Sequence, residues 1–203
     1  VGLDVAAIRR EFPILERTDH GRRLVYLDTA ATAQKPLAVI EAMDRYYRHL
    51  NANVHRGVYT LAEEATSAFE AGRAATARFI GAGDPHELVL TRNATESINL
   101  VARTWGRANL AEGDVVVVTE MEHHANIVPW QMLAAERGIE IRWVPIDGSY
   151  RLDLTDLDAL LDGAKLFSFT AMSNVLGTTN DVAALSAAAR RDRKSTRLNS
   201  SHT

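Results

Sequence analysis

The sequence has 203 residues, of which 46% are hydrophobic and 24% charged, and its 23 basic and 26 acidic residues give a net charge of −3. This composition is typical of a globular chain with a sizeable core, and the lack of a basic excess argues against nucleic-acid partners and a polybasic membrane anchor. No apolar run approaches the roughly 20 residues that span a bilayer, and the first residues do not resemble a secretory signal, so we expect a cytoplasmic protein without membrane association.

The N-terminal part of the chain is predicted to be mostly helical. The expected elements are helices over residues 4–12, 36–50 and 61–80 and a short strand over residues 23–28. Pro36 suits the first turn of the second helix, because its missing N–H would be unpaired there in any case. Gly81 and Gly83 follow the third, Ala-rich helix and are expected to end it.

From residue 87 onward, predicted strands and helices alternate. Strands are expected over residues 87–91, 114–119, 139–144 and 166–171, and helices over residues 94–105, 125–137, 155–161 and 181–191. Residues 114–119 contain four consecutive valines, a pattern typical of a strand buried on both faces. The alternation predicts an α/β fold with a mainly parallel sheet flanked by helices, in which ligands bind at the carboxyl ends of the strands.

The composition changes after Arg191. Residues 192–203 read DRKSTRLNSSHT, which is polar and without periodicity. We therefore divide the chain into a domain over residues 1–191 and a tail over residues 192–203. Composition alone favours a disordered tail, whereas its resemblance to the translation of a common sequencing adapter indicates a non-native segment at which the gene is truncated.

The first candidate site follows the strand expected to end at Thr91. Asn93 is a good helix N-cap, and Glu96 three residues later gives a pattern like a capping box. The free backbone N–H groups and the positive end of the helix, together with the Thr95 hydroxyl, would suit a phosphate. The alternative is an ordinary helix cap without a ligand.

The second candidate site lies after the valine-rich strand. His123 and His124 are adjacent, so their side chains point in different directions, and no further ligand with recognisable spacing follows; we therefore expect no metal site. One histidine at a strand end can stack on an aromatic ligand or move protons near neutral pH. A solvated or capping histidine is the alternative.

Two further segments carry polar groups. Residues 173–178 (SNVLGT) follow the last predicted strand, and the amide of Asn174 could donate to a ligand oxygen, although Asn and Gly also favour an ordinary turn. His55 and Arg56 lie in an irregular stretch between two helices, where the arginine fork could bind a carboxylate or simply be exposed. Three of the four segments follow predicted strands, where this fold class places ligands.

The motifs resemble those of a known family. The matching segments are residues 26–31 (YLDTAA), 33–36 (AQKP), 54–57 (VHRG), 60–61 (TL), 94–96 (ATE), 121–131 (MEHHANIVPWQ) and 173–178 (SNVLGT). They are similar to the cysteine desulfurases of the sulfur-mobilisation (SUF) type, which belong to the class V aminotransferase group of fold-type I pyridoxal-phosphate enzymes. The resemblance runs to about Arg191, and the segment at 121–131 is its most specific part.

The resemblance implies pyridoxal 5'-phosphate as the cofactor and gives roles to matching positions. The Ala94 backbone and Thr95 would hold the cofactor phosphate. His123 would stack on the pyridine ring and act as a catalytic group in proton transfer. Asn174 would donate a hydrogen bond to the phenolic oxygen of the ring.

The resemblance also implies a substrate region and a reaction. Ala30 would line the substrate region, and His55 and Arg56 would lie near it across a homodimer interface. The family converts L-cysteine to L-alanine and passes the sulfur through an enzyme persulfide to a sulfur-acceptor protein for iron–sulfur cluster assembly. The cofactor is held by a lysine as a Schiff base, and a cysteine thiolate accepts the sulfur.

The chain departs from the family at this point. It has no cysteine, and its lysines, Lys35, Lys165 and Lys194, lack the small-residue and histidine context of the Schiff-base lysine. We therefore expect this chain alone to be inactive, and an incomplete sheet to make it poorly soluble. A fragment of a selenocysteine lyase or cysteine sulfinate desulfinase, and a non-catalytic short binding form, are the alternative interpretations.

Overall fold

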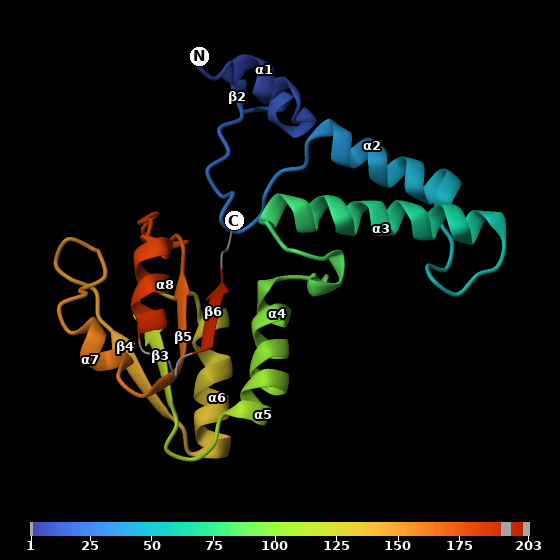
Figure 1. Ribbon diagram of the computed structural model, residues 1–203. Coiled ribbons are helices and arrows are strands. Elements are labelled where there is room, and N and C mark those ends of the chain that lie inside the picture. The colour runs from blue at the N-terminus through green and yellow to red at the C-terminus, as the bar shows by residue number, and fades with distance from the viewer. Residues whose placement is uncertain (1, 192–195, 201–203) are drawn as a thin grey trace. The chain divides into compact units, whose positions relative to one another are not determined.

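The computed structural model describes residues 2–191 and the backbone of residues 196–200 (Figure 1). Contacts between residues divide the chain into two compact units, residues 1–90 and 91–203. The second unit contains the three segments that the sequence places at strand ends. Among residues 2–191, no helix combines the length and the apolar character needed to cross a bilayer.

The first unit is mostly helical. Its elements are α1 (Val5–Arg10), η1 (Pro13–Glu16), β1 (Thr18–Asp19), β2 (Arg22–Arg23), α2 (Leu37–Arg45), η2 (Tyr46–Leu50), α3 (Thr60–Ile80) and η3 (Pro85–Glu87). The side chain of Asp4 caps α1 by accepting a hydrogen bond from the backbone N–H of Ala7 at 2.9 Å. α3 ends at Gly81, whose φ of +74° lies in the left-handed region that glycine adopts without strain. All three helices predicted for this part are confirmed.

Two predicted strands are wrong, those over residues 23–28 and 87–91. Both runs have apolar residues of high strand propensity, but neither finds a neighbouring strand among the described residues beyond the short β1–β2 hairpin. Val25, Leu27 and Val89 accordingly have 74%, 90% and 66% of their surface exposed. Strand propensity measures how well a side chain packs in a sheet, so it cannot form a strand without a partner.

The second unit is an α/β layer structure. Its elements are α4 (Ala94–Val101), η4 (Ala102–Gly106), α5 (Arg107–Asn109), β3 (Val115–Thr119), η5 (His124–Asn126), α6 (Val128–Arg137), β4 (Glu140–Val144), α7 (Leu157–Leu161), β5 (Ala164–Thr170), α8 (Val182–Arg191) and β6 (Thr196–Ser200). The strand order is β4–β3–β5–β6, and every neighbouring pair is parallel. The predicted α/β fold with a mainly parallel sheet is confirmed.

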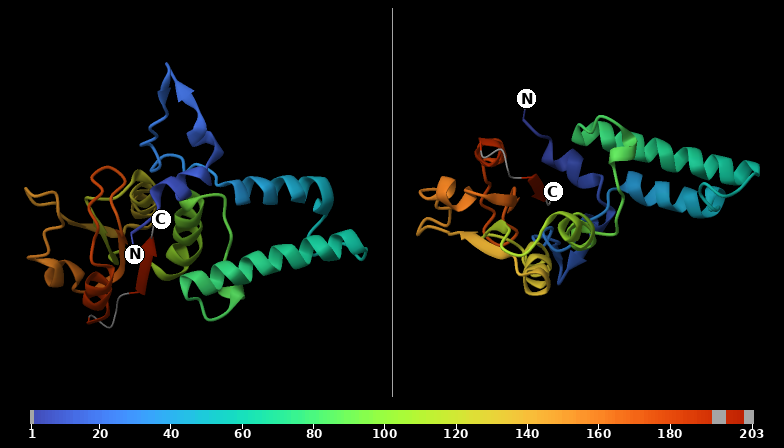
Figure 2. Two further views of the ribbon diagram at one scale, coloured as in Figure 1. Left: turned by 90° about the horizontal axis from the view of Figure 1, so that it is seen from above. Right: turned by 60° about the horizontal axis from the view of Figure 1, so that its bottom comes forward.

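The valine-rich strand β3 lies at the centre of the core. Val116 and Val118 face a hydrophobic cluster formed with α4 and α6, whereas Val115 and Val117 face a second cluster formed with α7 and α8. The two pairs of helices therefore cover opposite faces of the sheet (Figure 2). Burial of each valine side chain stabilises the fold by about 1.5–3 kcal/mol, which explains why this run forms a strand.

The tail predicted over residues 192–203 is placed only in part. The structure pairs the backbone of residues 196–200 with β5, where the sequence predicted no regular structure. The physical reason is that the edge of β5 offers unpaired N–H and C=O groups to any extended segment. Residues 192–195 and 201–203 lie outside the described residues, and the non-native origin of the tail stays a prediction.

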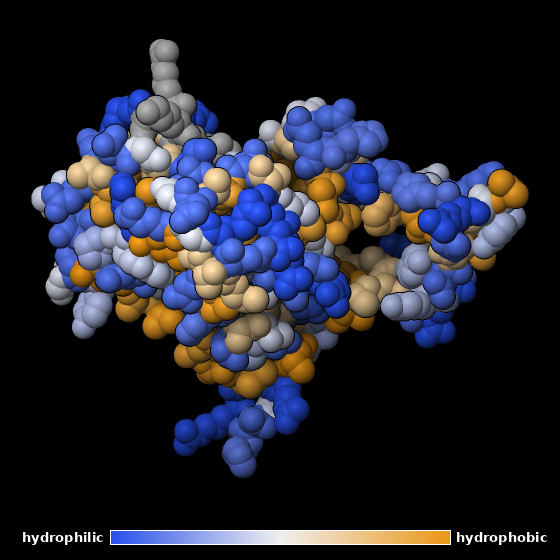
Figure 3. Space-filling model, turned by 90° about the horizontal axis from the view of Figure 1, so that it is seen from below, coloured by the Kyte–Doolittle hydropathy of each residue, from blue (hydrophilic) through white to orange (hydrophobic). Residues whose placement is uncertain are grey.

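Large apolar side chains are exposed on both units. Figure 3 shows hydrophobic residues at several places on one face of the molecule. In the first unit, Val58 is 99% and Phe79 90% exposed, and in the second unit Val175 is 82% exposed. Exposed apolar surface of this kind promotes association, which is consistent with the poor solubility predicted above.

Candidate functional site

The candidate site lies at the carboxyl ends of β3 and β5. These strands are parallel neighbours, so the loops that follow them leave the sheet at the same edge, the upper end of the second unit in Figure 1. η5, in the loop after β3, packs beside α4, which begins at the same end. The structure therefore brings together the segments that carry Thr95, His123 and Asn174.

The N-terminus of α4 offers free hydrogen-bond donors. The Asn93 side-chain oxygen accepts the N–H of Glu96 at 2.9 Å. The Glu96 carboxylate reaches back one residue further than a capping box requires, to the N–H of Arg92 at 2.7 Å. The Arg92 guanidinium also donates to this carboxylate, at 3.1 Å, and its side-chain hydrogen bond together with the backbone one lowers the pKa of Glu96. Among the described residues, no group accepts the N–H of Ala94 or Thr95, and Thr95 is exposed. Two such donors at a positive helix end suit an anion.

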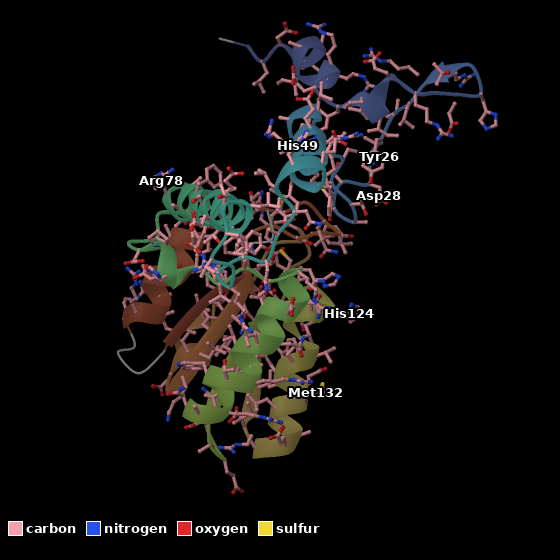
Figure 4. The ribbon with its side chains drawn as sticks, turned by 90° about the vertical axis from the view of Figure 1, so that its right-hand side faces the viewer. Tyr26, Asp28, His49, Arg78, His124 and Met132 are labelled. Atoms are coloured by element: carbon pink, nitrogen blue, oxygen red, sulfur yellow. The ribbon has the colours of Figure 1, made fainter. Side chains whose placement is uncertain are left out.

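His123 is held in a defined orientation. It is the N-cap of η5, and its Nδ1 accepts the N–H of Ala125 at 3.1 Å. Its side chain is exposed, and its ring lies edge-on to that of His124 at 6.0 Å between centroids. Figure 4 shows His124 near the start of α6, with Met132 further along that helix. Among the described residues, no group of three or more His, Cys, Asp or Glu side chains is arranged to hold a metal.

Asn174 lies in a tight turn, the local structure that Asn and Gly favour, and its role toward a ligand stays a prediction. The Ser173 N–H donates to the carbonyl of Thr178 at 2.9 Å, and the Gly177 N–H donates to the carbonyl of Ser173 at 3.0 Å. Gly177 has a φ of +69°, a conformation that few other residues adopt without strain. The turn leaves the Asn174 side chain exposed at the carboxyl end of β5.

Glu122 is a feature of the site that the sequence did not reveal. Its Oε1 accepts hydrogen bonds from the Thr119 hydroxyl at 2.5 Å and the Thr170 N–H at 2.7 Å. Its Oε2 accepts from the Asn126 amide at 2.8 Å. Burial raises the pKa of Glu122, and the bonds from Asn126, Thr119 and Thr170 oppose that rise. The carboxylate thus ties the ends of β3 and β5 to the loop that carries His123.

A second set of bonds continues this network. Asn126 is completely buried, and its Oδ1 accepts from the Ser168 hydroxyl at 2.8 Å and from the Trp130 indole N–H at 3.0 Å. The sequence contained one signal for this arrangement: Glu122, Asn126 and Trp130 follow each other at intervals of four residues, the spacing at which side chains on a helical turn meet.

Within the first unit, the loop that carries His55 and Arg56 is held by several contacts with α3. His55 has a φ of +65°, unusual for a residue with a side chain. Its Nε2 lies 3.0 Å from the Glu70 carboxylate, and its N–H donates to the Thr66 hydroxyl at 3.0 Å. The ring of Phe69 lies edge-on to the imidazole at 5.7 Å. Arg56, the next residue, is exposed in the same turn.

Ala30 lies in a separate exposed turn of the first unit. The N–H groups of Ala31 and Thr32 both donate to the Asp28 carbonyl at 3.1 Å. The Tyr26 hydroxyl closes the turn by donating to the Thr32 carbonyl at 2.6 Å. Tyr26 and Asp28 lie close together in Figure 4. That Ala30, His55 and Arg56 serve the same site as His123 stays a prediction.

Lys165 is engaged away from the strand ends. Its ammonium group pairs with Asp114 at 3.2 Å at the amino end of the sheet. Thr170 lies five positions further along β5, which is roughly 17 Å along an extended strand. Lys165 is therefore poorly placed to reach a ligand beside His123.

Comparisons with a family model and with known proteins agree on the family of this chain. The model of the class-V aminotransferases matches residues 25–197. A cysteine desulfurase of Klebsiella pneumoniae is 51% identical over 186 residues, which cover 91% of this chain and 46% of that protein. One of Synechococcus elongatus is 49% identical over 179 residues, which cover 88% of this chain and 29% of that protein.

A solved structure agrees with these sequence matches. The apo structure of a cysteine desulfurase from Thermococcus onnurineus superposes with a TM-score of 0.89 at 36% identity, covering 98% of this chain and 48% of that one. The chain thus spans less than half the length of these relatives and shares the fold-type I architecture. The chain belongs to the class-V aminotransferase family and corresponds to an N-terminal portion of its cysteine desulfurases.

Proposed function

We propose that this chain is the cofactor-binding part of a cytoplasmic, pyridoxal-phosphate-dependent cysteine desulfurase. The single observation that carries the proposal is the meeting of the Thr95, His123 and Asn174 segments at one edge of the sheet. The identity of about half with relatives named cysteine desulfurase supports the choice of reaction.

The residues at this edge fit the proposed cofactor. The N–H groups of Ala94 and Thr95 and the Thr95 hydroxyl supply donors for a phosphate. The exposed ring of His123 offers a flat face for an aromatic ring and a nitrogen that can hold a proton. The exposed amide of Asn174 offers a donor for a phenolic oxygen. Bound pyridoxal phosphate would supply an electron sink, which amino-acid side chains lack.

The remaining parts of the function lie partly outside this chain. We propose L-cysteine as the substrate, with Ala30, His55 and Arg56 in the substrate region of a homodimer and a sulfur-acceptor protein as the partner in iron–sulfur cluster assembly. The guanidinium of Arg56 suits the substrate carboxylate. Because the chain has no cysteine, the residue that accepts the sulfur must come from elsewhere, and the chain alone is inactive.

A chimeric enzyme tests this proposal. Residues 1–191 would be joined to the part of the Klebsiella pneumoniae relative that lies beyond its aligned segment, which supplies the missing half. With pyridoxal phosphate and a thiol, the chimera should release alanine and sulfide from L-cysteine, and the chain alone should not. Selenocysteine and cysteine sulfinate assayed in parallel decide between the related reactions. A folded chimera that binds the cofactor but releases no sulfide from L-cysteine would refute the proposed activity.

A further inference from the structure

A buried polar network surrounds Glu122, to which the proposed function gives no role. The donors to its carboxylate come from three segments: Thr119 at the end of β3, Thr170 at the end of β5, and Asn126 in η5. A carboxylate bound by three donors is a strong anchor, because hydrogen bonds to a charged group exceed those between neutral groups. The network therefore does more than cap a single turn.

The direction of each bond in the network is fixed by groups that can only donate. The indole N–H of Trp130 has no acceptor capacity, so the atom of Asn126 that faces it must be the carbonyl oxygen. The Asn126 amide nitrogen then faces Glu122 Oε2. The backbone N–H of Thr170 likewise requires an acceptor at Oε1. Both oxygens of Glu122 must accept, a role that the ionised carboxylate fulfils and an amide cannot.

His123 lies in the turn between the two anchored residues. Glu122 precedes it and accepts a hydrogen bond from Thr170 at the end of β5. Asn126 follows it and accepts a hydrogen bond from Ser168 within the same strand. Inside this turn, the Ala125 N–H donates to His123 Nδ1. A neutral imidazole that accepts at Nδ1 carries its proton on Nε2, so the turn selects one of the two tautomers.

We propose that Glu122 is a positioning residue for His123. By tying the turn to β5, its carboxylate holds the Ala125 N–H against Nδ1 and thereby fixes the orientation of the ring and its Nε2–H tautomer. The use of that ring toward a cofactor rests on the proposed function, whereas the orientation and the tautomer belong to the chain itself. An amide at position 122 would face the Asn126 amide or the Thr170 N–H, donor against donor, and would release the turn.

The test is imidazole nitrogen NMR on the 203-residue chain labelled with ¹⁵N-histidine. His123→Gln identifies the His123 signals among the 7 histidines. In the wild type, Nδ1 should resonate where unprotonated imidazole nitrogen does. In Glu122→Gln it should shift toward the averaged position of a free imidazole. Glu120→Gln is the matched control, because Glu120 is an exposed glutamate two residues away whose carboxylate, among the described residues, accepts only the N–H of Ile146.

A purely structural role for Glu122 would lower stability without changing the tautomer. Each variant is therefore judged by the His123 signals in samples that circular dichroism shows to be folded. Thr119→Val, which removes a single bond to the carboxylate, is the second variant if Glu122→Gln does not fold, and it should shift Nδ1 in the same direction. A folded variant with unchanged His123 signals would overturn the proposal, and so would unfolding of both variants. Neither outcome depends on cofactor binding, so failure of this proposal can be told apart from failure of the proposed function.

Discussion

The indole N–H of Trp130 donates to the side-chain oxygen of Asn126 at 3.0 Å, and each residue exposes no more than 1% of its surface. This bond orients the Asn126 amide so that its nitrogen meets Glu122. Trp130, in α6, thus fixes the orientation of the Asn126 amide and with it the direction of the hydrogen bond to Glu122.

Replacing the Asn126 amide by a carboxylate should disrupt the network. In Asn126→Asp, an acceptor faces Glu122 Oε2, so two buried acceptors meet and Glu122 loses a donor. Loss of a buried hydrogen bond that leaves a group unsatisfied costs about 1–3 kcal/mol, and repulsion between the two carboxylates adds to it. Urea denaturation at neutral pH should therefore show a loss of at least about 2 kcal/mol in the free energy of unfolding. A change within 0.5 kcal/mol, the scatter roughly expected for surface substitutions, would show that the network contributes little.

Glu122 should also give the protein a distinctive pH dependence. Because burial raises its pKa in the folded state, the native protein binds this proton more tightly than the unfolded chain does. The stabilisation that comes from binding this proton is therefore fully present below the unfolded pKa, roughly 4.3, and is lost as the pH rises through the folded pKa. The hydrogen bonds that the ionised carboxylate accepts from Thr119, Asn126 and Thr170 remain above that pH. The difference in unfolding free energy between wild type and Glu122→Gln should fall as the pH rises from that point. Denaturant unfolding at a series of pH values measures it, and a flat or rising difference would contradict the raised pKa.

Two glycines give opposite predictions for the same substitution. A Cβ at Gly106 would lie 2.8 Å from Leu133 Cδ2 and 3.7 Å from the ring of Trp130, so Gly106→Ala should destabilise the second unit by about 1–3 kcal/mol. A Cβ at Gly72, inside α3, would meet nothing within 4 Å. Gly72→Ala should therefore stabilise that helix by roughly 0.5–1 kcal/mol. Thermal unfolding of both variants measures the contrast, and equal effects would show that the close packing at Gly106 is relaxed in solution.

The contacts that hold His55 in place lead to a further prediction. The positive φ of His55 is maintained by Glu70, Thr66 and Phe69, all on α3. Thr66→Val removes the acceptor of the His55 N–H but keeps the side-chain volume, so the loop should become more mobile with a loss of roughly 1 kcal/mol or less. Amide hydrogen exchange at residues 54–57 should become faster, and exchange in α3 should not. Unchanged exchange at residues 54–57 would mean that the remaining contacts suffice.

The sequence predicted the parts of this fold that depend on local pattern. The valines of β3 signal a strand buried on both faces, and Gly81 signals the end of α3, because these features act within a few residues. The strands predicted at 23–28 and 87–91 fail because strand formation needs a partner from elsewhere in the chain. The meeting of the His123 and Asn174 segments followed from the rule for parallel sheets.

The network around Glu122 was harder to foresee. Its bonds to Thr170 and from Asn126 to Ser168 join residues 48 and 42 positions apart, and no local pattern encodes them. The pairing of His55 with Glu70 is of the same kind, since it depends on how the loop folds back on α3. Local residue patterns thus indicated the exposed groups that we propose for the cofactor, but not the long-range contacts that hold those groups in place.

Titration of the chain with pyridoxal phosphate, followed by ³¹P NMR and absorbance, tests the central claim most directly. We expect saturable binding that Thr95→Val and His123→Gln each weaken and that His124→Gln, its neighbour and matched control, leaves unchanged. Borohydride should trap no stoichiometric adduct at a single lysine, because Lys165 is paired at the amino end of the sheet. Binding that is equally strong in His123→Gln and His124→Gln, or stoichiometric trapping at one lysine, would contradict the account.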